Sequence, residues 1–130
     1  MKNKTKVIIY SVIAASFIVF VPLLVTSDKS GSALLDSFAQ CLTNKSAVMY
    51  GADWCPHCQN EKRAFGDSFR LINYVECPDD PNLCLEKEIR GYPTWIFPDP
   101  SAGPEQSGKK LEGEQGLERL SRESGCSLPD

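Results

Sequence analysis

Two cysteines separated by two residues give this sequence its clearest chemistry. They stand in Cys55-Pro56-His57-Cys58, and this spacing brings both sulfur atoms onto one turn of a helix. A disulfide between them can then open and close without a large movement of the backbone. The unpaired amide groups and the dipole of a helix N-terminus favour an anion, so we expect Cys55 to be the reactive thiolate.

The two residues between the cysteines are predicted to tune the pair. Pro56 suits a first helical turn because its missing amide hydrogen costs no helical bond. His57 stabilises a neighbouring thiolate when it is charged or donates a hydrogen bond, and a stabilised thiolate makes the disulfide a better oxidant. The plainer alternatives are an exposed His57, a static bridge or a metal site. Zinc sites need two such pairs or more histidines, and His57 is the only histidine, so no metal is expected.

The flanking sequence must hold this pair between a strand and a helix. We expect helices over 34–42, 56–69, about 80–90 and 116–124, and strands over 47–50, 71–77, 94–97 and 109–113. Gly66 is expected to loosen or kink the second of these helices. This order predicts an α/β fold in which a parallel pair and an antiparallel hairpin form a mixed four-stranded sheet with helices on both faces.

The amino-terminal segment predicts a membrane anchor. Residues 7–25 are uncharged and long enough to cross a hydrocarbon layer of about 30 Å. Lysines precede the segment and Asp28 is the first acid after it, which by the positive-inside rule places the rest of the chain outside the cytoplasm. We therefore expect an anchor over 1–27, a linker over 28–33 and a domain over 34–130. The alternative is a cleaved signal peptide, with small residues at 25–27, which would give a secreted form.

Composition narrows the class of protein. A length of 130 residues suits one small domain after the anchor, expected to be monomeric. The 17 acidic residues outnumber the 14 basic ones, and no basic cluster is large enough to neutralise a polyphosphate, so nucleic acid is not an expected partner. Six cysteines in such a chain indicate an oxidising compartment and disulfide bridges.

Two motifs resemble the thioredoxin superfamily. The first is Ala52-Asp53-Trp54 followed by the Cys-Pro-His-Cys run, and the second is Gly91-Tyr92-Pro93-Thr94, which matches the cis-proline loop of that superfamily. They stand in the right order and spacing, and the resemblance covers residues 34–125. It implies a thioredoxin-like fold and a redox-active disulfide as the only reactive group, with no separate cofactor.

A narrower resemblance connects more of the chain with one branch. Together with the cysteine-pair helix, residues 38–42, 72–77, 81–84 and 91–95 are similar to the thioredoxin-like domain fused to bacterial homologues of vitamin K epoxide reductase. That family couples a quinone-reducing membrane enzyme to a domain that passes disulfides to secreted proteins. The resemblance implies a singly anchored protein that acts on secreted or envelope proteins and is reoxidised by such a membrane partner.

The superfamily resemblance also implies roles for individual residues. Cys55 is the nucleophile that forms a mixed disulfide, and Cys58 resolves it. Pro93, if cis, places the Tyr92 backbone beside the sulfurs, where it can pair with a substrate strand. Trp54 would flank that groove. The plainer interpretations are a trans proline that opens an edge strand and a tryptophan that belongs to the core.

One position departs from the superfamily pattern. Many members carry a buried acid six residues before the first active cysteine, and this chain has Met49 there. Proton transfer from Cys58 must then use water, His57 or another group.

The four remaining cysteines allow three pairings. A local bridge between Cys77 and Cys84 would staple the turn between a strand and a helix, and the resembled family implies the same pair. A bridge between Cys41 and Cys126 would close a long loop between the first and last helices. The alternative is a buried Cys41 and a free thiol at Cys126.

The sequence thus predicts a membrane-anchored thiol:disulfide oxidoreductase that faces the extracytoplasmic side and donates disulfides. One alternative keeps the fold and reverses the electron flow, so that a membrane donor feeds a reducing or isomerising protein. Another, from a different class, is a metal-binding or chaperone module without enzymatic turnover.

Overall fold

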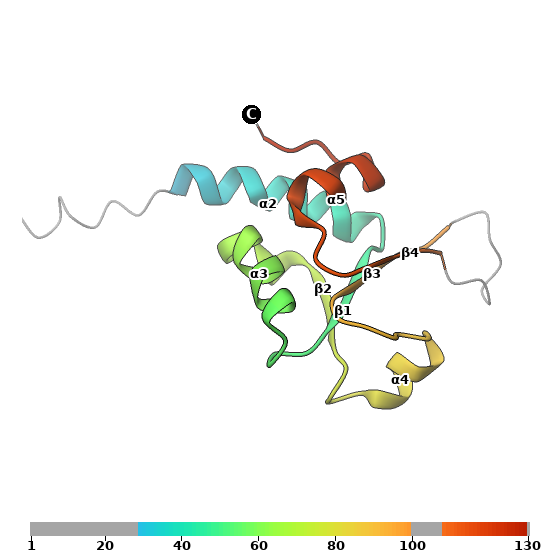
Figure 1. Ribbon diagram of the computed structural model, residues 1–130. Coiled ribbons are helices and arrows are strands. Elements are labelled where there is room, and N and C mark those ends of the chain that lie inside the picture. Colours follow the sequence, from blue (N-terminus) through green and yellow to red (C-terminus); the bar gives the residue numbers. More distant parts are fainter. Residues whose placement is uncertain (1–28, 100–107, 130) are drawn as a thin grey trace, which may run out of the picture.

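The computed structural model describes residues 29–99 and 108–129, which form a central sheet with helices on both of its faces (Figure 1). In chain order the elements are α2 (Lys29–Asn44), β1 (Val48–Gly51), α3 (Pro56–Phe65), the 3-10 helix η2 (Gly66–Leu71), β2 (Asn73–Glu76), α4 (Pro81–Glu86), β3 (Thr94–Phe97), β4 (Lys109–Glu112) and α5 (Gly116–Ser124).

The sheet is mixed, as the sequence predicts. Its strand order is β2-β1-β3-β4, with β1 and β2 parallel and the other two neighbouring pairs antiparallel. The parallel register places Met49 beside Tyr74 and Gly51 beside Glu76. The expected parallel pair, crossover helix and antiparallel hairpin are confirmed, and with them the α/β fold class.

Alternation along the strands divides the apolar side chains between two clusters. The larger cluster lies under α2, α3 and α5, and it is centred on Met49 and Trp95, both fully buried. The smaller cluster lies on the opposite face, beneath α4, and contains Tyr50, Ile96 and Cys84. Figure 1 shows α4 on the far side of the sheet from α2 and α5. Each face of the sheet is therefore closed by helices, which leaves the strand ends to carry the functional groups.

The largest differences from the sequence prediction lie at three helix boundaries. Helix α2 begins at Lys29 rather than at residue 34, so residues 29–33 of the expected linker are helical; no proline there prevents it. Helix α3 ends at Phe65 because Gly66 adopts φ +55°, a left-handed conformation that glycine tolerates. Helix α4 ends at Glu86, short of residue 90, because Glu88 turns the chain with φ +51°.

None of the helices in the described part of the chain has the length and apolar character that a membrane span requires. The predicted anchor over 1–27 lies outside the described residues.

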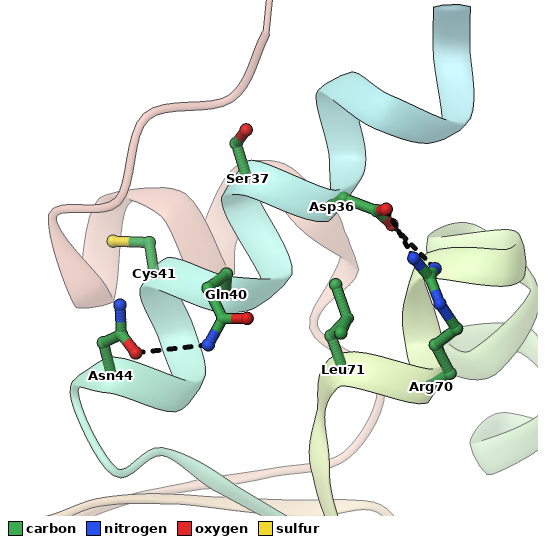
Figure 2. A pocket seen from close by; sticks show the side chains of 7 residues that line it. All are labelled: Asp36, Ser37, Gln40, Cys41, Asn44, Arg70 and Leu71. Atoms are coloured by element: carbon green, nitrogen blue, oxygen red, sulfur yellow. Dashed lines mark hydrogen bonds and ion pairs between the residues drawn. The ribbon is translucent and has the colours of Figure 1, made fainter. Parts of the chain in front are cut away.

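An ion pair joins α2 to the 3-10 helix. Both terminal guanidinium nitrogens of Arg70 donate to the Asp36 carboxylate, at 2.8 and 2.5 Å (Figure 2). The Ser68 hydroxyl also donates to this carboxylate, at 2.6 Å. The Arg70 hydrogen bonds, followed by the one from Ser68, lower the pKa of Asp36 from 3.8 to about 2. The folded state therefore favours the ionised carboxylate.

Removing the ion pair between Arg70 and Asp36 is expected to lower the free energy of unfolding at neutral pH but not in strong acid. Because the folded-state pKa lies below the unfolded one, the contribution is present above about pH 4 and is lost as the pH falls towards 2. Arg70→Met should lower the urea midpoint at neutral pH, and the difference from the parent protein should vanish below pH 2. Arg90→Met, which also removes an exposed guanidinium, is the control. A midpoint difference that persists below pH 2 would assign the effect to packing rather than to charge.

Candidate active site

The cysteine pair lies where β1 passes into α3. Cys55 is the residue that precedes the helix, in an extended conformation, and Pro56 occupies the first turn. Ala52 accepts a hydrogen bond from the Cys55 amide at 3.0 Å, which turns the chain from strand into helix. Both cysteines are free thiols in this structure. Cys55 therefore stands at the helix N-terminus, directly before the first turn of α3.

The two sulfurs have different surroundings. The Cys58 side chain is fully buried, whereas Cys55 keeps 6% exposure. Burial is the main cause that raises the pKa of Cys58 to about 12, and hydrogen bonding with Cys55 contributes in the same direction. Cys58 thus retains its proton at neutral pH, while Cys55 is the sulfur that an external reactant can reach.

The predicted substrate-binding residues surround Cys55. Its thiol lies 3.7 Å from the Tyr92 carbonyl oxygen, and the peptide bond between Tyr92 and Pro93 is cis. The Trp54 ring is 69% exposed and packs edge-on against Tyr92, with ring centroids 6.0 Å apart. The structure thus brings Trp54, Tyr92 and Pro93 together beside Cys55, the more exposed of the two cysteines.

His57 points away from the core towards the loop before α5. Its Nδ1 lies 2.9 Å from Glu114 Oε2, which also accepts a hydrogen bond from Asn60 at 3.1 Å. The bond from His57 is the largest cause that lowers the pKa of Glu114. Sequence reasoning missed Glu114 because it is far along the chain. Among residues 29–99 and 108–129, no group of three or more His, Cys, Asp or Glu residues is arranged to hold a metal ion.

A second polar group, absent from the sequence prediction, lies behind the cysteine pair. The Tyr74 hydroxyl donates to Glu76 Oε2, and Glu76 Oε1 accepts the Asp53 amide at 2.9 Å. The Lys62 ammonium lies 2.5 Å from Asp53 Oδ1 and 3.9 Å from the centre of the Tyr74 ring. These four residues link the strand β2, the helix α3 and the loop that leads into it.

A buried acid is present, although not at the position that the superfamily pattern indicates. Met49 is fully buried in the larger core cluster, whereas Glu61 on α3 is only 1% exposed. Glu61 Oε2 accepts hydrogen bonds from the amides of Gln115 and Gly116, at 2.8 and 3.4 Å, so it faces the start of α5. Burial is the main cause that raises the pKa of Glu61.

The other four cysteines form two disulfides. Cys77 pairs with Cys84 across the turn between β2 and α4, and Cys41 on α2 pairs with Cys126 just after α5. Gly125, with φ +69°, ends α5 and turns the chain back towards α2. The sequence alone leaves the pairing of Cys41 with Cys126 open.

Comparison with known proteins gives thioredoxin-like relatives. The chain matches no protein-family model. It is 36% identical over 108 residues to a thiol-disulfide oxidoreductase of Arabidopsis thaliana, covering 76% of this chain and 26% of that protein. It is 36% identical over 83 residues to protein disulfide isomerase-like 2-1 of Oryza sativa subsp. japonica, covering 56% of this chain and 21% of that protein. The chain thus spans about a quarter or less of the length of these relatives.

The fold was also compared with solved structures. The germline-specific thioredoxin Deadhead from Drosophila melanogaster aligns with a TM-score of 0.49 at 14% identity, covering 61% of this chain and 76% of that one. The sequence relatives and the strand order together support a thioredoxin-like chain whose homologues are named as thiol-disulfide oxidoreductases and protein disulfide isomerases.

Proposed function

We propose that this protein exchanges disulfides with substrate proteins through Cys55 and Cys58. The observation that carries the proposal is the pair's placement, with Cys55 at the N-terminus of α3 and Cys58 fully buried one turn later. A substrate cysteine would form a mixed disulfide with Cys55, and Cys58 would resolve it. Trp54 and the Tyr92 backbone would contact the substrate chain.

The proposed setting is extracytoplasmic and membrane-anchored. The lysine-flanked apolar segment over 7–25 supports it, as do the two disulfides, which are typical of oxidising compartments. In this setting the protein donates disulfides to secreted or envelope proteins. A quinone-linked membrane enzyme, of the kind related to vitamin K epoxide reductase, would reoxidise it.

A Cys58→Ser variant should trap substrates on Cys55. Without the resolving thiol the mixed disulfide cannot collapse, so adducts should accumulate in envelope extracts and disappear on treatment with dithiothreitol. The matched control is a variant in which both cysteines are serine, which should carry none. If Cys58→Ser yields no adducts under non-reducing conditions, the exchange function is wrong.

Relatives named as protein disulfide isomerases support a second candidate, in which the same pair reduces or isomerises substrates. The reduction potential separates the two directions. A value near or below that of thioredoxin, about −270 mV, would contradict the disulfide-donor version. Tight stoichiometric copper or zinc binding by the reduced protein, without turnover of a disulfide substrate, would instead favour a metal-binding module.

A further inference from the structure

The space above Gly51 is bordered by a tyrosine hydroxyl on one side and by the resolving cysteine on the other. A Cβ at this position would lie 2.9 Å from Cys58 Sγ and 3.2 Å from the Tyr74 hydroxyl oxygen. Both atoms therefore face the small space that glycine leaves open. Tyr74 reaches it from β2, where the parallel register sets it beside Met49.

Cys58 needs a partner for its proton. The thiol is fully buried and its pKa is about 12, chiefly because of that burial. Exchange nevertheless requires Cys58 to lose a proton when it attacks Cys55 and to gain one when it leaves. Met49, whose side chain has no ionisable group, stands where many members of the resembled superfamily have a buried acid.

The Tyr74 hydroxyl is already connected to a carboxylate. It donates to Glu76 Oε2, and the Asp53 amide holds the other oxygen at 2.9 Å. Glu76 is only partly buried, so its carboxylate can exchange protons with water. Besides Glu76, the charged or titratable groups that face Tyr74 and Cys58 are Asp53 from the loop, Lys62 from α3 and Cys55.

We propose that Tyr74 and Glu76 form the proton path of Cys58, an inference that rests on the proposed exchange function. When Cys58 resolves a mixed disulfide, its thiol proton passes to the Tyr74 hydroxyl, which gives its own proton to the Glu76 carboxylate. The Cys58 electron pair then forms a bond with Cys55 Sγ, and the substrate sulfur leaves as a thiolate.

The same path operates in the opposite direction. A substrate thiolate bonds to Cys55 Sγ, the bond between Cys55 and Cys58 breaks, and its electron pair goes to Cys58. Cys58 takes a proton from the Tyr74 hydroxyl, which regains one from water through Glu76. Because the hydroxyl accepts one proton as it releases another, no phenolate accumulates. Burial, followed by the hydrogen bond to Glu76, raises the pKa of Tyr74, which is consistent with this concerted transfer.

Two other groups compete for this role. Glu61 lies one turn after Cys58, and its Oε1 is buried without a hydrogen-bond partner among the described residues. Its Oε2, however, is bound to the Gln115 and Gly116 amides, which directs the carboxylate towards the start of α5. His57 is exposed and pairs with Glu114. Tyr74 is the group that shares the space above Gly51 with the Cys58 sulfur, and it is the one that the geometry favours.

The test follows the two exchange steps of the full-length reduced protein with an aromatic disulfide, 5,5′-dithiobis(2-nitrobenzoate). The first release of thionitrobenzoate reports attack by Cys55, and the second reports resolution by Cys58. Tyr74→Phe keeps the ring contacts with Lys62 and Phe69 and removes only the hydroxyl. It should leave the first release unchanged, slow the second by about 10-fold to 100-fold, and make its rate rise more steeply with pH.

Glu76→Gln should slow the second release in the same way. The matched control is Tyr50→Phe, the same substitution on the opposite face of the sheet, which should leave both releases unchanged. If Tyr74→Phe does not fold, Glu76→Gln decides. The inference is overturned if both variants retain the parent rate and pH profile of the second release, or if Glu61→Gln slows that release instead. Absence of the first release from the parent protein would contradict the exchange function itself.

Discussion

Replacing Cys55 with serine is expected to slow thiol-disulfide exchange by at least about 10³-fold, the scale seen when a catalytic nucleophile is removed. A serine hydroxyl does not ionise near neutral pH, so it cannot form the mixed disulfide that starts each exchange. Cys58 is a poor substitute because it is fully buried and its pKa is about 12. The loss should therefore include the first release of thionitrobenzoate as well as the second.

The matched control for this variant is Cys58→Ser. It should keep the first release at close to the parent rate and lose only the second, because Cys55 retains its place at the start of α3. Alkylation with iodoacetamide gives an independent measurement: the label should appear on Cys55 in the reduced parent protein and in Cys58→Ser. Rapid first release or labelling in Cys55→Ser would reverse the two roles.

Local sequence signals predicted the frame of this site well. The strand over 94–97 and the helix over 116–124 have the predicted bounds, because turn-forming residues mark their ends. The Cys-Pro-His-Cys run lies at a strand-to-helix junction, as predicted, since a short apolar strand is followed after a short loop by a proline that suits a first helical turn. These features depend on neighbouring residues, which a single sequence displays.

The rest depends on register and distance between separate elements. Tyr74 borders the same space above Gly51 as the Cys58 sulfur because β1 and β2 pair with Met49 beside Tyr74. The alternation of a strand does not reveal which residue of another strand lies opposite. Glu114 reaches His57 across 57 positions of chain. The start of α2 was predicted too late because the apolar pattern marks only the side of a helix that packs against the core, not its full length.

Removing the disulfide between Cys41 and Cys126 is expected to have the largest effect on stability. The two cysteines are 85 positions apart, and closing a loop of that length restricts the unfolded chain by about 4 to 5 kcal/mol in the loop-entropy model. Most domains are stable by only about 5–15 kcal/mol. A variant with both cysteines changed to alanine should therefore lose a large part of its free energy of unfolding, measured by urea denaturation under non-reducing conditions.

The disulfide between Cys77 and Cys84 provides the matched control, since the two residues are 7 positions apart. The same model gives this short loop about 2 kcal/mol. Each double variant loses two sulfur atoms. The difference between their free energies of unfolding, about 2 kcal/mol, therefore reports the effect of the length of chain that each bridge encloses. Equal destabilisation would contradict this explanation. It would indicate that both bridges act mainly by packing in the folded state, because only the restriction of the unfolded chain depends on loop length.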